Sequence, residues 1–519
     1  MNKMAERQNS LISPLKKPVV CVAAGILLLT GCVTEQPDYS PANLIHHWPP
    51  TAQSAAVSSG YLSEVVSLHL AEISSPPVIN QAHLYQLPEL IDMAQMNNPD
   101  TRIAWQQARQ AALAVGMTEA TFLPMISASV IGGYQQNHTS LPYHKALEST
   151  HHTTLAGVGF QWLLFDFGQR SALVDAAKHV SFAADVSFNG LHQKLIHDVT
   201  KTYFQYGASL SRVDISRKMF TNSRTILAAA QARQHNGIAT AVEVAQAKQL
   251  VAQAELNLVL AQGAERNAWQ ALLAAIGISP NTHFRVHFDS HRPLPEMRSE
   301  LTQTMITRAL SRRPDLLASY AAAQAAASDV RAAQAAFSPK IFLAGALAGG
   351  NGRVDIPRLP SVGAEASSST LLLGISVPLY DGGLRTARVQ EAQSRATVAS
   401  DVFKKHQDAA VREIVVSAST LRSALESHRA ARHLVSTARV TYDAAFEAYR
   451  HGVGTISVAN EAANGLLSAE QMNVDAYTSA LIAAANLAFV LGEMTQASGN
   501  IPNTMEPPLS DETQETTFG

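Results

Sequence analysis

Alternating apolar and polar positions predict a pair of β-strands in the first half of the chain. Ile126, Ala128 and Val130 fall on one face, and Ser127 and Ser129 fall on the other. This period of two residues fits a strand with one apolar face. The expected strands are 125–135 and 153–165, joined by a polar loop at about 135–152. The apolar face continues through Gly132, Tyr134, Ala156, Val158, Phe160, Trp162 and Leu164.

After the strands the period changes to that of a helix. No proline interrupts the chain from 168 to 235, and Ile196, Val199 and Tyr203 begin a stripe with 3-4 spacing. Such a stripe is typical of a coiled-coil seam. A helix of this length spans about 100 Å at about 1.5 Å per residue. A turn at Gly237 should follow, and then a returning helix at 239–277.

A shorter helix is expected to begin at Pro99, because proline fits the first turn of a helix, where its missing N–H is not needed. Together, this helix and the returning helix come close to the long helix in length. The lengths therefore predict two short helices stacked end to end along one long helix.

The chain repeats itself with a fixed offset. Pro99-Asp100 recurs as Pro314-Asp315, 215 positions later. The same shift relates Phe122, Pro124, Leu164, Asp166, Gly168, Arg170, Gly237, Thr240, Ala254, Glu255 and Gly277 to Phe337, Pro339, Leu379, Asp381, Gly383, Arg385, Gly452, Thr455, Ala469, Glu470 and Gly492. Identity at so many Pro, Gly and Asp positions indicates two tandem structural repeats. In each copy the aspartate can cap the long helix, with the glycine at the turn.

The repeat predicts the elements of the second half. Strands are expected at 340–350 and 369–380 with a loop at about 351–368, a long helix at 383–450 and a returning helix at 454–492. The predicted division is an irregular, proline-containing leader at 32–84, repeat 1 at 85–280, a linker at 281–299, repeat 2 at 300–495 and a disordered tail at 496–519.

Residues 1–31 have the organisation of a secretory signal. A basic start is followed by an apolar run of about a dozen residues and then by Leu29-Thr30-Gly31-Cys32. This ending looks like a bacterial lipobox, in which Cys32 becomes the acylated N-terminus. In the lipoproteins that this signal resembles, an aspartate directly after the cysteine favours retention in the inner membrane. Val33 at this position therefore favours the outer membrane as the destination. The alternative is an N-terminal helix that is kept in the fold.

Composition excludes several functions. Hydrophobic residues are 46% and charged residues 15% of the chain, and the formal net charge is -2. Such a balance provides no basic stripe for nucleic acid. Only Cys21 and Cys32 are present, so the body has neither a disulfide framework nor a four-cysteine zinc site. No cofactor is expected, and the motifs of nucleotide-binding, serine-hydrolase and zinc-protease sites are absent from the sequence.

If the four strands enter a bilayer, they cannot remain an open sheet. Each unsatisfied backbone group in lipid costs several kcal/mol, so an exposed edge costs on the order of tens of kcal/mol. Bacterial barrels have at least about eight strands, which two chains or three would supply. We therefore expect chains to pool their strands. The alternative is a soluble four-stranded sheet.

The whole set of features resembles the TolC-type outer membrane factors, most closely their lipoprotein efflux branch, called NodT-like. The resemblance rests on the lipobox, the duplicated helix–strand–strand–helix–helix unit, Leu164-Phe-Asp-Phe-Gly168 with Leu379-Tyr-Asp-Gly-Gly383, and the turns Gly237-Ile-Ala-Thr240 and Gly452-Val-Gly-Thr455. It implies a mixed α and β membrane protein: a homotrimer with a twelve-stranded β-barrel in outer-membrane lipid, continuous with a periplasmic coiled-coil α-barrel. It further implies a passive exit duct without enzyme activity, coupled to a periplasmic adaptor and an inner-membrane transporter.

The resemblance assigns roles to residues near the two turns. Gly237, Thr240, Gly452 and Thr455 would form tips that dock the adaptor, and they would be ordinary helix–helix turns in any case. Glu461, with Ser457 one turn before it, matches the acidic gate of the family, and Glu243 is its weaker counterpart in repeat 1. The stretch Asn460-Glu461-Ala462-Ala463 departs from the family's usual Leu-Asp-Ala-Gln. Glu461 is therefore either a gate or a solvated helix carboxylate.

Three histidines, His283, His287 and His291, are spaced by four as on one face of a metal-binding helix. Because Pro280, Pro293 and Pro295 surround them, loop histidines are the favoured interpretation. Two functional alternatives also remain open. The duct could serve type I protein secretion instead of small-molecule efflux, or the chain could be a structural envelope lipoprotein without a pore.

Overall fold

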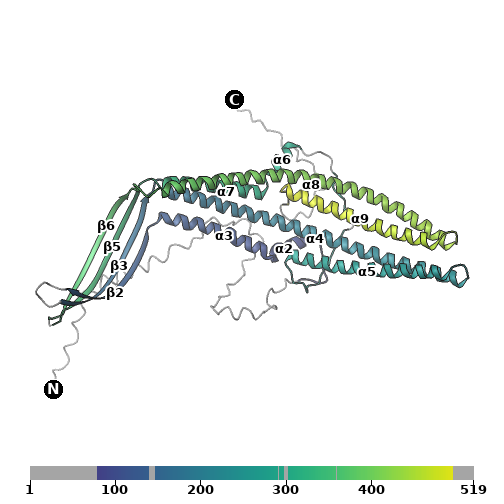
Figure 1. Cartoon of the computed structure of the whole chain (residues 1–519), viewed down its shortest axis with the longest axis horizontal. Helices are drawn as coiled ribbons and strands as arrows, with labels where there is room; N and C mark the ends of the chain where they lie inside the picture. Colours follow the sequence, from purple (N-terminus) through teal and green to yellow (C-terminus); the bar gives the residue numbers. More distant parts are fainter. Residues whose placement is uncertain (1–78, 140–146, 290–291, 297–301, 358, 495–519) are drawn as a thin grey trace, which may run out of the picture.

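The computed structural model describes residues 79–139, 147–289, 292–296, 302–357 and 359–494. The proposed lipidation site Cys32 and the expected tail lie outside the described residues. The chain forms a long helical body with a curved β-sheet at one end (Figure 1). The helices are α2 Leu87–Asn97, α3 Pro99–Glu119, α4 Gln169–His235, α5 Ala241–Ile276, α6 Gln303–Leu310, α7 Pro314–Ala335, α8 Leu384–Arg450 and α9 Ile456–Val490, with a short 3-10 turn, η2, at Ala120–Phe122.

The two long helices α4 and α8 have 67 residues each and run the length of the helical body. Along α4, helix α3 packs on the half near the sheet and α5 on the half near the turn (Figure 1). Helices α7 and α9 flank α8 in the same way. Two short helices thus lie end to end beside each long one, as their lengths predict.

Each repeat begins with one helix more than the sequence pattern predicted. In repeat 1 the chain breaks between α2 and α3 at Asn98, whose side chain accepts a hydrogen bond from Asp100 N at 2.9 Å and caps α3. In repeat 2, α6 precedes α7 in the same way. The break coincides with Pro99 and Pro314, which favour an extended residue before them; Asn98 and Arg313 both have extended backbones.

The four long strands form one antiparallel sheet in the order β2-β3-β5-β6. They are longer than the alternating pattern predicted: β2 Met125–Thr139, β3 Leu147–Phe165, β5 Lys340–Asp355 and β6 Val362–Ser376. Much of the loops expected at 135–152 and 351–368 is therefore paired strand. Many of the added residues are polar, as in 136–139 and 149–152, and apolar periodicity could not find them because strand pairing needs only the backbone. Strand β6, in contrast, ends at Ser376, short of the expected residue 380.

The expected linker at 281–299 contains ordered structure. Strand β4 Arg285–Val286 pairs in parallel with β1 Leu84–Tyr85 from the start of repeat 1. Phe284 is buried beside Tyr85, with ring centroids 5.2 Å apart. The segment also places the ring of Phe288 directly against the backbone of α4 at Gly207, where an added Cβ would lie 2.0 Å from it. The absence of a side chain at Gly207 therefore allows this close approach.

Buried side chains form three clusters along the helical body rather than one core. The first surrounds Tyr203 and Phe204 beneath the linker, the second lies near the hairpin turns around Tyr449, and the third joins α6, α8 and α9 around Leu421. Within the described part of the chain, no helix has the length and apolar character needed to cross a membrane.

Gly207→Ala should destabilise the protein because the new methyl group would overlap the Phe288 ring. Overpacking of this kind costs about 1–3 kcal/mol, which urea unfolding followed by circular dichroism in detergent would measure. The matched control is Gly263→Ala on α5, where the nearest atom lies 3.9 Å away. It should be neutral or stabilising by up to about 1 kcal/mol through helix propensity. Equal stabilities of the two variants would contradict the packing argument.

Candidate functional site

Each helical hairpin reverses at a glycine with positive φ. Gly237 has φ 74° and Gly452 has φ 81°, a conformation that costs other residues strain. At the first turn Ile238 N donates to Arg233 O at 2.9 Å, and at the second Val453 N donates to Ala448 O at 3.0 Å. This is the hydrogen-bond pattern that commonly ends a helix at glycine. The two glycines were therefore correctly located as turns.

A threonine begins the returning helix at each tip. Thr240 Oγ1 accepts from Glu243 N at 3.2 Å, while Glu243 Oε1 accepts from Thr240 N at 3.3 Å, so the two residues form a capping box. Thr455 Oγ1 accepts from Val458 N at 3.4 Å without the reciprocal contact. Both threonines have a structural role in the turns.

The tips also present apolar side chains that the sequence reasoning missed. Ile238 and Val453 follow the two glycines, and Val242 and Val458 lie in the first turn of each returning helix. All four are more than half exposed. Exposed apolar residues gathered at one end of a molecule mark a surface that another protein can cover.

The two hairpins contact each other just above the turns. Arg233 near the end of α4 donates from Nη1 to the carbonyl of Tyr449 near the end of α8, and its guanidinium lies 4.8 Å from the centre of the Tyr449 ring. The Tyr449 side chain is fully buried. Burial raises the pKa of its hydroxyl, and the nearby Glu243 carboxylate raises that pKa further. Glu243 is thus placed between the hairpins and in a helix cap.

The proposed gate residues of repeat 2 have a different environment. Ser457 and Glu461 are exposed and lie one turn apart on α9, opposite the buried Ala459 and Ala463. Among the described residues, no cation pairs with Glu461. The sequence put Glu461 and Glu243 in corresponding roles, whereas in the structure of one chain the Glu461 side chain is exposed and that of Glu243 makes local contacts.

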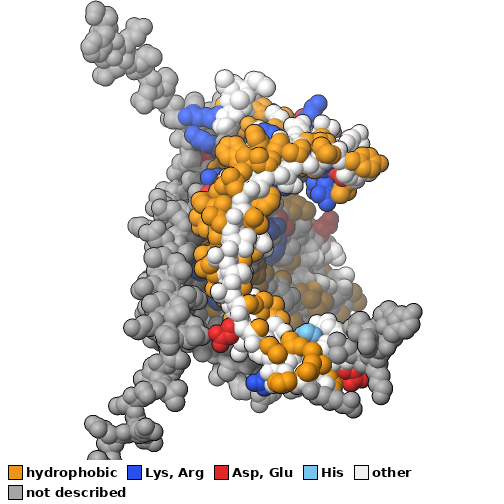
Figure 2. Space-filling model, turned by 90° about the vertical axis from the view of Figure 1, so that its left-hand side faces the viewer, with side chains coloured by type: hydrophobic (Ala, Val, Ile, Leu, Met, Phe, Trp, Pro, Cys, Tyr) orange, Lys and Arg blue, Asp and Glu red, His pale blue; other side chains and the backbone are white. Residues whose placement is uncertain are grey.

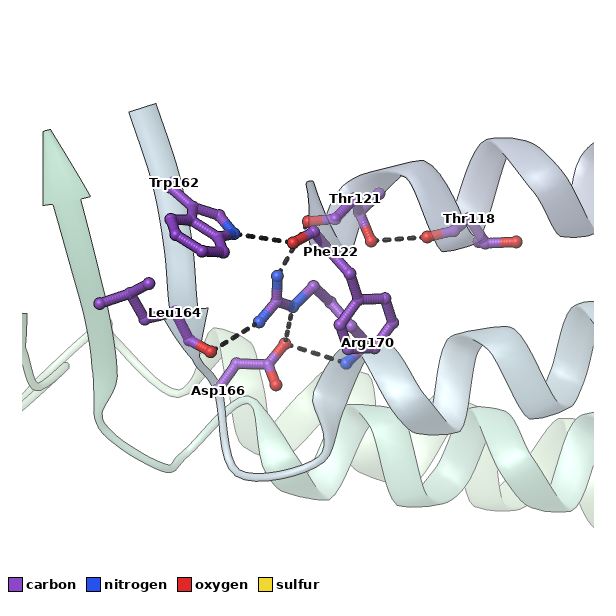
Figure 3. A network of polar contacts seen from close by, with 7 residues as sticks. All are labelled: Thr118, Thr121, Phe122, Trp162, Leu164, Asp166 and Arg170. Carbon is purple, nitrogen blue, oxygen red and sulfur yellow. Dashed lines mark hydrogen bonds and ion pairs between the residues drawn. The ribbon is translucent and has the colours of Figure 1, made fainter. Parts of the chain in front are cut away.

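A buried polar network joins the sheet to the helices (Figure 3). Asp166, at the end of β3, accepts hydrogen bonds from Arg170 N at 3.0 Å and Arg170 Nε at 2.9 Å. Arg170 Nη1 donates to Thr121 O at 2.8 Å, and Trp162 Nε1 donates to Phe122 O at 2.7 Å. The Asp166 and Arg170 side chains are only 6% and 8% exposed. Asp166 caps α4 as expected, and with Arg170 it also fixes η2 against β3.

Repeat 2 has the same arrangement in a more exposed setting. Asp381 accepts from Arg385 Nε at 2.6 Å, and Arg385 lies 5.0 Å from the centre of the Phe337 ring. The hydrogen bonds from Arg385 lower the pKa of the Asp381 carboxyl. The preceding Leu379 and Tyr380, however, are 91% and 90% exposed. The two junctions share the Asp–Arg pair, but Arg385 Nη1 donates to Pro378 O at 2.9 Å and not to the preceding turn, and Val377 stands where repeat 1 has Trp162.

The two linker histidines that the structure describes, His283 and His287, do not lie on a helix. His287 follows β4, where its N donates to Tyr85 O at 2.9 Å and its carbonyl accepts from the Tyr203 hydroxyl at 2.7 Å. His283 precedes β4, and His291 lies outside the described residues. In the described ranges, no group of three or more His, Cys, Asp or Glu side chains could hold a metal ion.

Comparison with known proteins identifies the family. The sequence profile of the outer membrane efflux protein family matches residues 90–278 and 305–493, one segment in each repeat. The chain belongs to this family, and it is an outer membrane efflux channel protein.

Its relatives are distant but similar over nearly their whole length. Outer membrane protein OprJ of Pseudomonas aeruginosa is 24% identical over 442 residues, which cover 85% of this chain and 88% of OprJ. The probable outer membrane lipoprotein SilC of Salmonella typhimurium is 22% identical over 487 residues, 90% of this chain and 96% of SilC. The crystal structure of the Campylobacter jejuni CmeC outer membrane channel matches with a TM-score of 0.67 at 18% identity, covering 80% of this chain and 87% of that one.

Asp166→Ala should destabilise the junction strongly, because it leaves the Arg170 guanidinium buried without its carboxylate. Breaking a buried ion pair costs about 3–5 kcal/mol, to be measured as the shift in urea unfolding. In the control Asp175→Ala, the lost partner is Arg331 in an exposed pair at 3.1 Å, and the cost should stay below about 1 kcal/mol. Similar losses in both variants would refute a special role of the junction.

Proposed function

We propose that the protein works as a homotrimer whose three four-stranded sheets close into a twelve-stranded barrel, continuous with a barrel of helices. The single observation that carries this proposal is that both edges of the β-sheet in one chain are open. Among the described strands, β2 and β6 each have a partner on one side only. An open sheet in lipid leaves backbone groups unsatisfied at a cost of several kcal/mol each. The sheet must therefore close with strands from other copies.

One face of the sheet is suited to lipid. Cross-strand rows such as Ile126, Phe160, Gly345 and Leu371 carry apolar side chains on this face. Viewed from the sheet end, the molecule presents a curved wall on which hydrophobic side chains predominate (Figure 2). From residue 341 to 349 the band extends about 27 Å along β5 at about 3.4 Å per residue, and less across the membrane once the strands tilt. This agrees with the apolar band of about 25 Å in outer-membrane barrels.

The opposite face is suited to a lumen. It carries mostly small or neutral side chains, and among its described residues Lys340 near the helices is the one lysine or arginine. Examples are Ser127, Gly159, Ala346 and Ser368. Short side chains leave the inside of a wide barrel open to water. Such a lining does not select among solutes, which supports a passive duct.

The helical body has open sides that match those of the sheet. Among the described helices, α4 lies between α3 and α5 on one side and α7 and α9 on the other, and α8 contacts α7, α9 and the short α6. The outer surfaces of α8 and of the α3–α5 pair therefore have no further long helix of the described chain against them. Large apolar side chains are exposed on both of these open sides: Val398 and Val440 on α8, and Val259 and Leu260 on α5. Three copies would cover these surfaces and extend the duct into the periplasm.

The duct would carry small molecules outward and would be anchored by acylation of Cys32, an assignment supported by the similarity to the lipoprotein SilC. At the far end, the tips at Gly237, Thr240, Gly452 and Thr455 would dock a periplasmic adaptor coupled to an inner-membrane transporter. The exposed Ile238 and Val453 supply the apolar surface for that contact. A ring of three Glu461 carboxylates would select cations at the entrance.

The purified protein should run as a heat-sensitive trimer and conduct ions in planar bilayers, with a preference for cations. Glu461→Lys should reduce the cation-to-anion permeability ratio severalfold, because it replaces three negative charges by three positive ones. The control Glu255→Lys makes the same charge change on α5, far from the turn. A monomer, or a trimer without conductance, would exclude the duct. An unchanged selectivity of the Glu461 variant would exclude the gate alone.

Val453→Asp should weaken binding of the trimer to the periplasmic adaptor of its efflux system about tenfold or more. Burial of one valine contributes about 1.5 kcal/mol, and about 1.4 kcal/mol corresponds to a factor of ten in affinity. The matched control Val453→Leu keeps an apolar side chain and should bind as the unchanged protein does. Surface plasmon resonance on immobilised trimer would measure both. Tight binding of the aspartate variant would place the docking surface elsewhere.

A further inference from the structure

The pairing of the described strands within one chain bears on how the strands of neighbouring copies pair. The sheet has two contacts within a repeat, β2–β3 and β5–β6, and one contact between repeats, β3–β5. In a closed ring the remaining contact, between β6 of one copy and β2 of the next, also joins repeat to repeat. If the repeats are equivalent, the β3–β5 register therefore specifies the β6–β2 register.

The two repeats are equivalent residue by residue. Ile126 pairs with Phe160 in repeat 1, and the residues 215 positions later, Ile341 and Ile375, pair in repeat 2. The shift holds along the shared part of both hairpins without a change of register. The β3–β5 register can thus be transferred to the next contact by moving each residue by this offset.

We propose that neighbouring copies join through β6 and β2 with Leu373 opposite Gly132 and Ser369 opposite Gln136 of the next copy. These pairs correspond to Val158–Leu347 and Thr154–Asn351 in the β3–β5 contact. The same register sets Leu372 opposite Gly133, Leu371 opposite Tyr134 and Ser367 opposite His138. The proposal rests on the trimer proposed above and adds to it the identity of each contact.

Side-chain volumes support this register independently. Within the chain, two of the paired glycines are covered by a ring from the adjacent strand: a Cβ at Gly345 would lie 2.2 Å from the Phe160 ring, and one at Gly374 would lie 2.3 Å from the Phe342 ring. On the open edge of β2, by contrast, Gly132 and Gly133 have no atom within 4 Å of such a position.

The proposed register brings the exposed Leu373 and Leu372 of β6 onto these two glycines, so that large side chains meet small ones. A slip of two residues in one direction sets both leucines against Val130 and Ile131. A slip in the other direction sets them against Tyr134 and Gln135. Since cross-strand neighbours on one face lie only about 4.5–5.5 Å apart, the proposed register packs best.

The end of β6 provides a second independent observation. Near the end of β3, Trp162, Leu163 and Phe165 extend beyond β2 and pair, among the described strands, with β5 alone, with a bulge at Leu164. Their equivalents in repeat 2 are residues 377–380, and β6 stops just before them at Ser376. In the proposed contact, Val377 faces Ala128 and Tyr380 faces Ile126 of the next copy. The strand predicted from sequence to reach 380 would then be complete, and the exposed Leu379 and Tyr380 would lie at the contact between copies.

Cysteine cross-linking of the full-length trimer tests the register. We would combine Ser369→Cys with Gln136→Cys, and separately Thr370→Cys with Gln135→Cys, because one of these adjacent pairs has the closer, non-hydrogen-bonded geometry. Since β2 and β6 are opposite edges of one sheet, any disulfide joins two copies. Oxidation should convert at least one double variant into covalent dimers and trimers on denaturing gels, and single variants should give none.

The slipped pairs Ser369→Cys with Tyr134→Cys and Ser369→Cys with His138→Cys serve as matched controls. Their Cβ atoms would be about 7–8 Å apart, beyond the 3.5–4.5 Å of a disulfide, so they should link about tenfold less. If a slipped pair links best, or if no pair links in an assembled trimer, the register is wrong while the duct stands. If unheated gels and mass measurement show only monomer, the proposed function and the register both fail.

Discussion

Backbone hydrogen bonding at the two edges of the sheet is the constraint on which the rest of the structure depends. A polypeptide that places four strands in lipid must satisfy the N–H and C=O groups of its outer strands, and water is not there to do so. This demand makes assembly a condition of membrane insertion. The outermost of the described long helices follow the edge strands along the chain, because α3 leads into β2 and β6 leads into α8.

Duplication supplies a simple solution to this constraint. Each repeat contributes one hairpin of strands and one hairpin of helices, and the polar junction at Asp166 and Arg170 fixes the first to the second. The copy in repeat 1 lies in the middle of the chain and is buried, whereas Leu379 and Tyr380 of repeat 2 stand at the edge and are exposed. The difference follows the position in the sheet, since β3 lies between β2 and β5 whereas β6 is an edge strand of the described sheet. Both junctions keep the same aspartate, arginine and phenylalanine.

Sequence reasoning located the long helices and the glycine turns well, because both depend on local rules: uninterrupted 3-4 periodicity and the positive φ of Gly237 and Gly452. It underestimated the strands, since residues such as Gln136 and Thr150 pair through the backbone alone. It also missed β4 and the close packing of Phe288 on Gly207, which join segments that are distant in sequence. Among the site residues, it found the turns but could not separate Glu243, held by Thr240 and close to Tyr449, from the solvated Glu461.

The sequence by itself determined the repeat, the lengths of the helices and the alternation of the strands, because these follow from the order of residue types along the chain. Only the tertiary structure decided which strand lies beside which, that β3 joins β5 across the repeats, and that Arg233 meets Tyr449 between the hairpins. These contacts join residues far apart in the chain. Their geometry depends on side-chain volumes and backbone pairing in three dimensions, which no local pattern records.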